Sequence, residues 1–380
     1  MTRPDPVELT QALVRIDTVN PPGNEDRCVE LLADLLSAAG YACRRHDFAP
    51  RRTSLVARIG VESARAPLAF TGHVDVVPLG GAVWKHDPFA ADIADGRLYG
   101  RGSSDMKSGV AAFTAAAIAQ ADRLRDGPGA SLIITAGEET GCEGAFAMAR
   151  APEARELLGS AGALVVAEPT GNAPLLGHKG AFWLSAEASG VTAHGSMPER
   201  GDNAVYKIAR AALALEHFEF ETAAHPLMGA PTLNVGTARG GLNINSVPDA
   251  AEIGIDIRTV AGQDHAQLLQ CLCRVLGPQI RLRPFLDVGS VYTEPDEPWM
   301  QRVFALCAAR SGHAPAHRTV SYFSDAAALR VPLGMPPIVI LGPGEPEMAH
   351  QTDEYCRVDR IREATVLYTD LIADWCAAVR

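Results

Sequence analysis

The stretch Ala66-Pro67-Leu68-Ala69-Phe70-Thr71-Gly72-His73-Val74-Asp75 decides the fold of this chain, because it joins an apolar, strand-like run to an imidazole and a carboxylate. Three other apolar runs also lead to residue types that bind metals: 130–135 before Glu138-Glu139, 163–167 before Glu168, and 337–341 upstream of His350. In open α/β sheets, ligands bind beyond the carboxyl ends of the strands. We therefore expect these side chains at one sheet edge, an arrangement typical of a two-metal hydrolase site.

The composition limits the partners and the compartment that we expect. The formal net charge of -11 argues against nucleic acid or an anionic membrane surface, which require basic patches. No apolar run approaches the ~18–20 residues that cross a bilayer, and no apolar segment of a secretory signal follows Met1-Thr2-Arg3-Pro4-Asp5-Pro6. The eight cysteines form no CxxC pair. We expect a cytoplasmic protein with reduced thiols.

The order of strand-like and helical patterns predicts two domains. Strands and helices alternate up to about residue 180 and again from about 290, which indicates a mixed sheet with helices on both faces. Between them, the patterns at 182–188, 203–217, 232–237, 251–258, 265–276 and 280–285 follow the order β-α-β-β-α-β. We expect an α/β catalytic domain of three layers at 1–180 and 290–380, interrupted by a ferredoxin-like α+β domain at 181–289.

The candidate ligands carry oxygen and nitrogen donors and no thiolate, which suits Zn²⁺, Mn²⁺ or Co²⁺. A neutral imidazole such as His73 needs an acceptor for its second N–H, and Asp75 lies two residues away. Asp105 either bridges two cations or caps the helix that follows it. Of the adjacent pair Glu138-Glu139, one carboxylate can bind a metal while the other holds a water.

With these residues in view, the chain resembles the M20 metallopeptidases, which include acetylornithine deacetylase, succinyl-diaminopimelate desuccinylase, aminoacylase and bacterial glutamate carboxypeptidase. The resemblance covers nearly the whole chain and rests on these motifs: 71–78, Trp84, 87–89, 96–102, 105–107, 137–139, 168–170, 342–344 and 349–350. It implies a zinc-peptidase-like catalytic domain with an inserted lid or dimerisation domain. One departure is Ser108, where relatives commonly carry glycine.

The resemblance also implies a role for each candidate residue. His73, Asp105 and Glu168 would bind one divalent ion, and Asp105 would bridge to a second ion that Glu139 and His350 also bind. Zinc is the expected metal, with cobalt or manganese as alternatives.

Three further roles follow from the same likeness. Asp75 would orient His73, and Glu138 would be the general base. In the inserted domain, His194 would stabilise the oxyanion from the partner subunit of a homodimer, while Asn245 and Arg258 would hold the carboxylate of the substrate.

We expect an amidohydrolase that removes the acyl group of a small N-acylated amino acid. Glutamate at position 168, as in the acylases and carboxypeptidases, favours that substrate class over the aminopeptidases. A dipeptidase or carboxypeptidase with the same chemistry is the first alternative, and a non-catalytic ligand-binding relative is the second. An oxidoreductase that binds a dinucleotide is excluded, because no GxGxxG turn follows the early strands.

Overall fold

The computed structural model describes residues 3–60 and 65–377, and the chain divides into two compact units. Unit 1 consists of Met1–Gly177, Tyr292–Arg318 and Ser324–Arg380, and unit 2 consists of His178–Val291 and Thr319–Phe323. Residues 1–2, 61–64 and 378–380 of the expected catalytic domain lie outside the described residues. β8 (Gly177–His178) and β13 (Val291–Tyr292) lie where the chain passes from one unit to the other.

Unit 1 contains a six-stranded mixed sheet in the order β1-β2-β6-β3-β7-β14. β1 and β2 are antiparallel to their neighbours, whereas β6, β3, β7 and β14 run parallel. The strands of this sheet are β1 (Ala42–Ala49), β2 (Arg52–Ile59), β3 (Leu68–His73), β6 (Ala130–Thr135), β7 (Ala163–Val166) and β14 (Ile338–Ile340). A second, three-stranded sheet joins β4 (Ile93–Ala94), β5 (Arg97–Tyr99) and β15 (Tyr355–Arg357).

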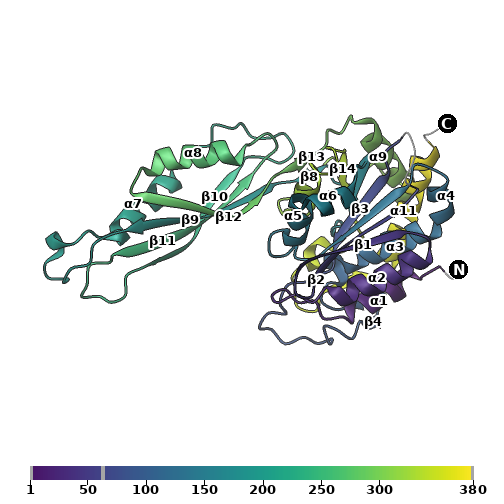
Figure 1. Cartoon of the computed structure of the whole chain (residues 1–380), viewed down its shortest axis with the longest axis horizontal. Coiled ribbons are helices and arrows are strands. Elements are labelled where there is room, and N and C mark those ends of the chain that lie inside the picture. Colours follow the sequence, from purple (N-terminus) through teal and green to yellow (C-terminus); the bar gives the residue numbers. More distant parts are fainter. Residues whose placement is uncertain (1–2, 61–64, 378–380) are drawn as a thin grey trace. The chain divides into compact units, whose positions relative to one another are not determined.

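Helices cover both faces of the larger sheet, as the buried central strands require. Every residue of β3, β6 and β7 is buried. One layer contains α1 (Pro6–Val14), α2 (Asp26–Ala38), α3 (Ser108–Ala119), α4 (Ala121–Arg125), α9 (Pro298–Ser311) and α11 (Val358–Ala377) (Figure 1). The other contains α5 (Glu143–Arg150), α6 (Pro152–Leu158) and α10 (Ala326–Leu329). Two short turns, η1 (Ser103–Lys107) and η3 (Pro346–Met348), complete the unit.

The close packing of β3 explains one glycine of the opening motif. A Cβ added at Gly72 would lie 2.8 Å from Met106 Cε and 2.9 Å from Val110 Cγ2. Since real Cβ contacts are not that short, the turn and helix that follow Asp105 pack against β3 only because position 72 has no side chain. β3 ends at His73.

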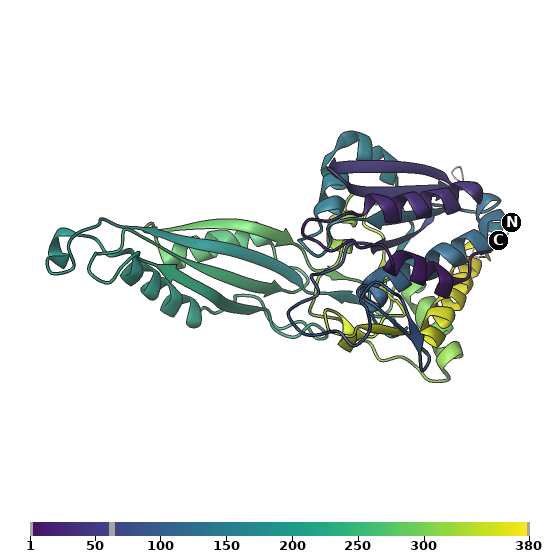
Figure 2. The same ribbon diagram turned by 90° about the horizontal axis from the view of Figure 1, so that it is seen from below.

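Unit 2 has the expected order of elements: β9 (Gly180–Ser189), α7 (Ala204–Glu216), β10 (Thr232–Gly240), β11 (Ala250–Thr259), α8 (His265–Leu276) and β12 (Ile280–Val288), with a short turn η2 (Pro198–Arg200). Its sheet is antiparallel in the order β10-β11-β9-β12. Both helices pack on one face of the sheet, where the unit has its apolar core (Figure 2). The expected ferredoxin-like fold is confirmed.

Among the helices of residues 3–60 and 65–377, none combines the length and the apolar character needed to cross a membrane.

Candidate metal centre

Six side chains of unit 1 meet beyond the carboxyl ends of its parallel strands. The order β6-β3-β7-β14 places those ends side by side, which is where ligands bind in sheets of this type. His73 is the last residue of β3. The other five lie in η1 or in the segments that follow β6, β7 and β14: Asp105, Glu138, Glu139, Glu168 and His350. The structure brings all six together.

His73 lies at the centre of the group and is 1% exposed. Its Nε2 atom lies 3.3 Å from Asp105 Oδ1 and 4.0 Å from both Glu138 Oε2 and Glu168 Oε1. Its Nδ1 atom lies 2.9 Å from the main-chain oxygen of Asp75 and 3.5 Å from Oδ1 of the same residue. The acceptor that orients this imidazole therefore includes the backbone of Asp75 as well as its carboxylate.

The Asp105 carboxylate presents one oxygen to each of two imidazoles. Its Oδ1 atom faces His73, and its Oδ2 atom lies 3.5 Å from His350 Nε2. His350 Nε2 is also 3.1 Å from Glu139 Oε2. The alternative that Asp105 caps a helix is wrong, because α3 begins after Lys107 and has no side-chain cap.

The buried Asp75 carboxylate accepts hydrogen bonds from the loop that follows β6. Its carboxylate accepts from the main-chain N–H groups of Glu138 at 3.1 Å and Glu139 at 3.2 Å, and from the Asn20 side chain at 3.0 Å. Burial raises the pKa of Asp75, but the contacts with His73, Asn20 and the Glu138 N–H outweigh it and lower that pKa to about 2. Asp75 is therefore a carboxylate at neutral pH.

Glu138 and Glu168 are buried beside other carboxylates. Burial and the neighbouring carboxylates raise the pKa values of Glu138 and Glu168 well above their usual range. Within this group of side chains, three buried atoms make no hydrogen bond to the described residues: His73 Nε2, Asp105 Oδ1 and Glu139 Oε1.

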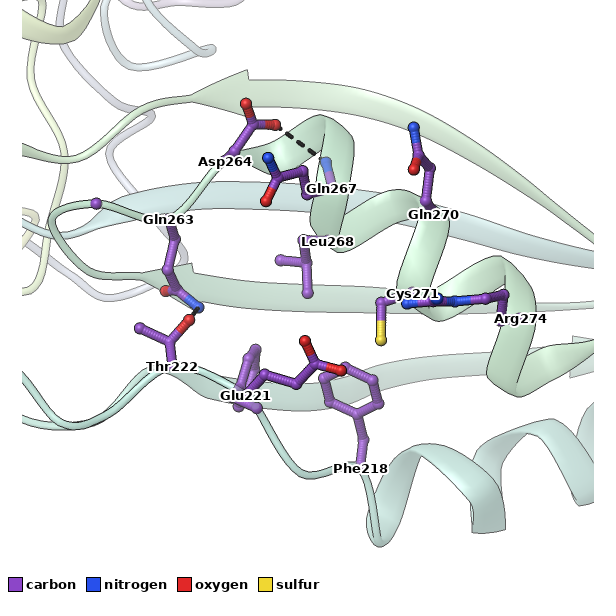
Figure 3. Close-up of a pocket in the computed structure, with 12 residues that line it drawn as sticks. Phe218, Glu221, Thr222, Gln263, Asp264, Gln267, Leu268, Gln270, Cys271 and Arg274 are labelled. Atoms are coloured by element: carbon purple, nitrogen blue, oxygen red, sulfur yellow. Dashed lines mark hydrogen bonds between the residues drawn. The ribbon is translucent and has the colours of Figure 1, made fainter.

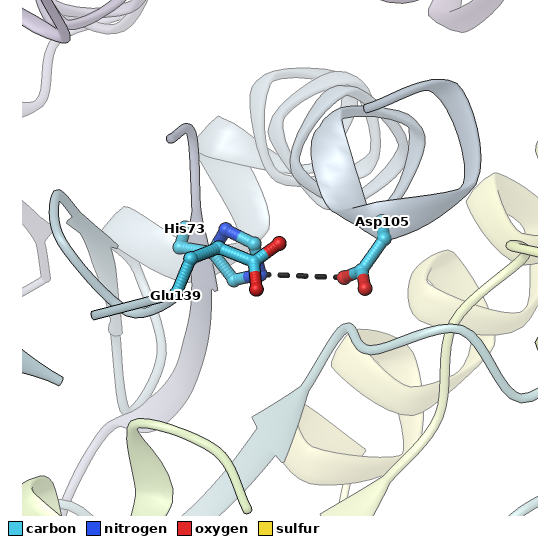
Figure 4. Close-up of side chains that lie close together, drawn as sticks. All are labelled: His73, Asp105 and Glu139. Atoms are coloured by element: carbon cyan, nitrogen blue, oxygen red, sulfur yellow. Dashed lines mark ion pairs between the residues drawn. The ribbon is translucent and has the colours of Figure 1, made fainter. Parts of the chain in front are cut away.

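The side chains that carry these three atoms fit a divalent cation. The ligand atoms of His73, Asp105 and Glu139 all lie within 4.8 Å of one another (Figure 4). Buried imidazole and carboxylate donors of this kind suit Zn²⁺, Co²⁺ or Mn²⁺.

The sequence-predicted residues of unit 2 lie at two different ends of its sheet. His194 and Asn245 are neighbours: Gly195 N donates to Asn245 O at 2.7 Å, and the His194 ring contacts Ser196 Oγ at 2.7 Å. Both lie beyond the Ala250 end of β11, whereas Arg258 is near the other end of that strand. At about 3.3 Å per residue, roughly 26 Å of strand separates Arg258 from Ala250.

Arg258 already has partners within unit 2. Its guanidinium lies 3.0 Å from Asp256 Oδ1 and stacks over the Trp183 ring, with 5.8 Å between the guanidinium carbon and the ring centroid. Arg258 therefore has an acidic and an aromatic neighbour on the sheet.

Several residues around the centre were not among the predicted site residues. Asn20 and Glu354 contact the loops of the metal centre. Arg101 lies in the motif at 96–102, but no role was predicted for it; it donates to Glu354. Asp325 is buried and accepts a hydrogen bond from Thr135 Oγ1. Burial raises the pKa of Asp325 to about 6.

A separate hollow of about 280 Å³ lies in unit 2 between α8 and the segment after α7 (Figure 3). Some of its polar side chains already bond within the unit: Asp264 accepts from the N–H groups of Ala266 and Gln267, and Gln263 donates to Thr222 Oγ1. We assign no chemistry to it.

A model of the peptidase family M20/M25/M40 matches residues 69–374. The chain belongs to this family. Among its M20 relatives, the succinyl-diaminopimelate desuccinylase of Cereibacter sphaeroides is 33% identical over 395 residues, which cover 98% of this chain and 99% of the relative. Succinyl-diaminopimelate desuccinylase 1 of Ruegeria sp. is 32% identical over 400 residues, covering 99% and 100%. This M20 protein is a metal-dependent hydrolase that acts on amide bonds.

Solved structures of M20 proteins share the fold. The metallo-carboxypeptidase Sso-CP2 of Sulfolobus solfataricus aligns with a TM-score of 0.77 at 17% identity and covers 98% of this chain and 100% of its own. The YXEP protein of Bacillus subtilis, a dinuclear metal-binding peptidase, aligns with a TM-score of 0.72 at 15% identity, covering 98% of each chain. The expected α/β class and family are confirmed.

Proposed function

We propose that this protein is a dinuclear amidohydrolase that removes the acyl group of an N-acylated amino acid. The observation that carries the proposal is the convergence of His73, Asp105, Glu139, Glu168 and His350 with Glu138 beside them. The relatives named succinyl-diaminopimelate desuccinylase, which match along the full chain, support this substrate class. The products would be a carboxylic acid and a free amino acid.

Each ligand has a proposed place. His73, Asp105 and Glu168 would hold one ion, and Asp105, Glu139 and His350 the other, with zinc as the favoured metal. When bound, two divalent ions supply positive charge that polarises the amide carbonyl and makes water more acidic. The two oxygens of Asp105, each facing a different imidazole, support its role as the bridge.

Glu138 is the proposed general base. It takes a proton from the attacking water and delivers it to the leaving amine, a role that suits a carboxyl group whose pKa is raised by burial. Asp75 supports this role indirectly, because its carboxylate accepts the Glu138 N–H and so fixes the backbone from which the base projects.

The substrate site would be shared between two copies of the chain. If Asn245 and Arg258 bind one substrate carboxylate, the roughly 26 Å of strand between their ends of the sheet requires them to come from different copies. Leu242 and Ile244, which are 97% and 104% exposed beside Asn245, are suited to contact with a second copy. β10 is an outer strand whose main chain can pair with another strand. His194 would then stabilise the oxyanion of the partner's reaction.

A hydrolysis screen tests the substrate class. Purified protein would be assayed with N-succinyl, N-acetyl, N-formyl and N-aminoacyl amino acids, starting with N-succinyl-diaminopimelate. Turnover of an N-acyl amino acid is expected to exceed turnover of dipeptides. A strong preference for dipeptides would replace the proposal with a peptidase of the same chemistry.

We also propose that the protein acts in the cytoplasm on a small-molecule substrate. The eight cysteines, none of which forms a disulfide in the described residues, agree with that compartment.

A further inference from the structure

Two loops of the metal centre are joined by the small three-stranded sheet of unit 1. β15 pairs with β5 so that Tyr355 lies opposite Tyr99. The pairing continues one step further, since Gly100 N donates to Glu354 O at 2.9 Å. The segment after His350 therefore runs beside the segment that leads to Asp105, although about 250 residues separate them in sequence.

The Glu354 side chain is fully buried and is surrounded by donors from the Asp105 loop. Its Oε1 atom accepts from the N–H groups of Ser104 at 2.8 Å and Asp105 at 3.0 Å, and its Oε2 atom accepts from the Gly102 N–H at 3.0 Å. Successive N–H groups that converge on one carboxylate fix the backbone that carries them. One of those N–H groups belongs to the proposed bridging ligand itself.

Arg101 extends the same contact to the loop of His350. Its guanidinium, 2% exposed, donates to Glu354 Oε2 at 2.7 Å and to the main-chain oxygens of Gln351 at 3.2 Å and His350 at 3.5 Å. His350 has a φ of 64°, a conformation that costs free energy for a residue with a Cβ. The bonds from Arg101 help to hold His350 in it.

We propose that Glu354 and Arg101 are positioning residues that set the separation of Asp105 and His350, and so determine the affinity of the ion that these two ligands share. The inference rests on the proposed ligand set. Neither residue is expected to touch the metal or the substrate. Partners that orient metal ligands typically account for about 10–100-fold in metal affinity.

The test is a titration of metal-free protein with Co²⁺. Binding is measured by calorimetry and by the visible absorption of the bound ion. In Glu354→Gln, an amide N–H₂ group would face Arg101 or the loop N–H groups. We expect one of the two Co²⁺ equivalents to bind about 10–100-fold more weakly. It should be the same equivalent that His350→Ala removes, and its absorption spectrum should change.

Two further variants separate positioning from general stability. Glu354→Asp keeps the charge that pairs with Arg101 but shortens the side chain, so a folded protein with an intermediate loss of Co²⁺ affinity is expected. Thr293→Val is the matched control, because it removes the buried hydrogen bonds between Thr293 and Ile338, which lie outside both ligand loops. It should lower stability and leave Co²⁺ binding unchanged.

Each result decides the inference. If folded Glu354→Gln and Glu354→Asp both bind Co²⁺ with wild-type affinity, the positioning role is wrong, but the proposed ligand set is unaffected. If Glu354→Gln does not fold, the affinity of Glu354→Asp decides by the same criterion. Failure of the unaltered chain to bind Co²⁺ would overturn the ligand set and this inference together.

Discussion

The side-chain amide of Asn20 donates a 3.0 Å hydrogen bond to the Asp75 carboxylate beneath His73. The same nitrogen donates to Thr140 Oγ1 at 3.0 Å, so it links the N-terminal turn to the loop that carries Glu138 and Glu139. Asn20 is 3% exposed. The Asn20 amide thus connects Asp75, which orients the proposed ligand His73, with the loop that carries the proposed ligand Glu139.

Asn20→Ala is expected to lower the free energy of unfolding by about 1–3 kcal/mol, because a buried carboxylate loses a donor. Thr140→Val should cost less, since it leaves the bond to Asp75 intact. Urea denaturation of both variants beside the unaltered protein measures the difference. Equal stability of Asn20→Ala and wild type would contradict the role given to this amide.

Glu138→Gln should keep the fold and the metal content but reduce kcat by about 10²–10⁴-fold, the usual share of a general acid–base group. The amide has nearly the same shape as the carboxyl group but cannot take up the proton. Steady-state kinetics with metal analysis of the same sample measures both effects. A variant with more than roughly a tenth of wild-type kcat would require another base.

Sharing of sites between subunits predicts complementation. Chains with His194→Ala and chains with Glu138→Gln should each be nearly inactive, whereas a heterodimer would contain one site with both groups. Mixed subunits, separated by different affinity tags, are therefore expected to regain part of the activity. No recovery in verified heterodimers, or a monomer by light scattering, would contradict the shared site.

Acid should destabilise unit 2 through His178. Burial lowers the pKa of this histidine to about 4, although its bond to Lys179 O opposes the shift. The unfolded chain binds the proton near pH ~6.5. The free energy of unfolding is therefore unaffected by His178 above about pH 6.5. It falls as the pH drops toward about 4, by roughly 3 kcal/mol in total.

Urea denaturation between about pH 7.5 and pH 4.5 measures this loss, since about two pKa units convert to roughly 2–3 kcal/mol. His178→Gln cannot gain a proton, so its stability should fall less over the same range. Parallel pH profiles for the variant and the unaltered protein would show that His178 does not titrate in this way.

The sequence predicted most strands of the larger sheet of unit 1 because these strands are buried on both faces and consist of apolar runs. It missed β1, where Arg44, Arg45 and His46 interrupt any such run. β1 is an edge strand that is exposed along much of its length, so polar residues are compatible with it and leave no apolar signal.

The candidate site was predictable where its residues follow strands, and unpredictable where contacts join distant segments. His73 and Glu168 are next to buried strands, whose ends meet at one sheet edge. Glu354 gave no local signal, since its partners at 101–105 become neighbours only through the pairing of β5 and β15. The acceptor that orients His73 likewise depends on the local turn of the backbone at Asp75.

Removal and return of the metal tests the central proposal most directly. Protein freed of metal by a chelator should lose its hydrolytic activity on an N-acyl amino acid, and activity should return on addition of Zn²⁺ or Co²⁺, with binding that saturates at two ions per chain. Asp105→Ala should impair both ions, whereas His350→Ala should mainly impair one. Full activity of rigorously metal-free protein, or saturation of the active enzyme at a single ion, would contradict a dinuclear centre.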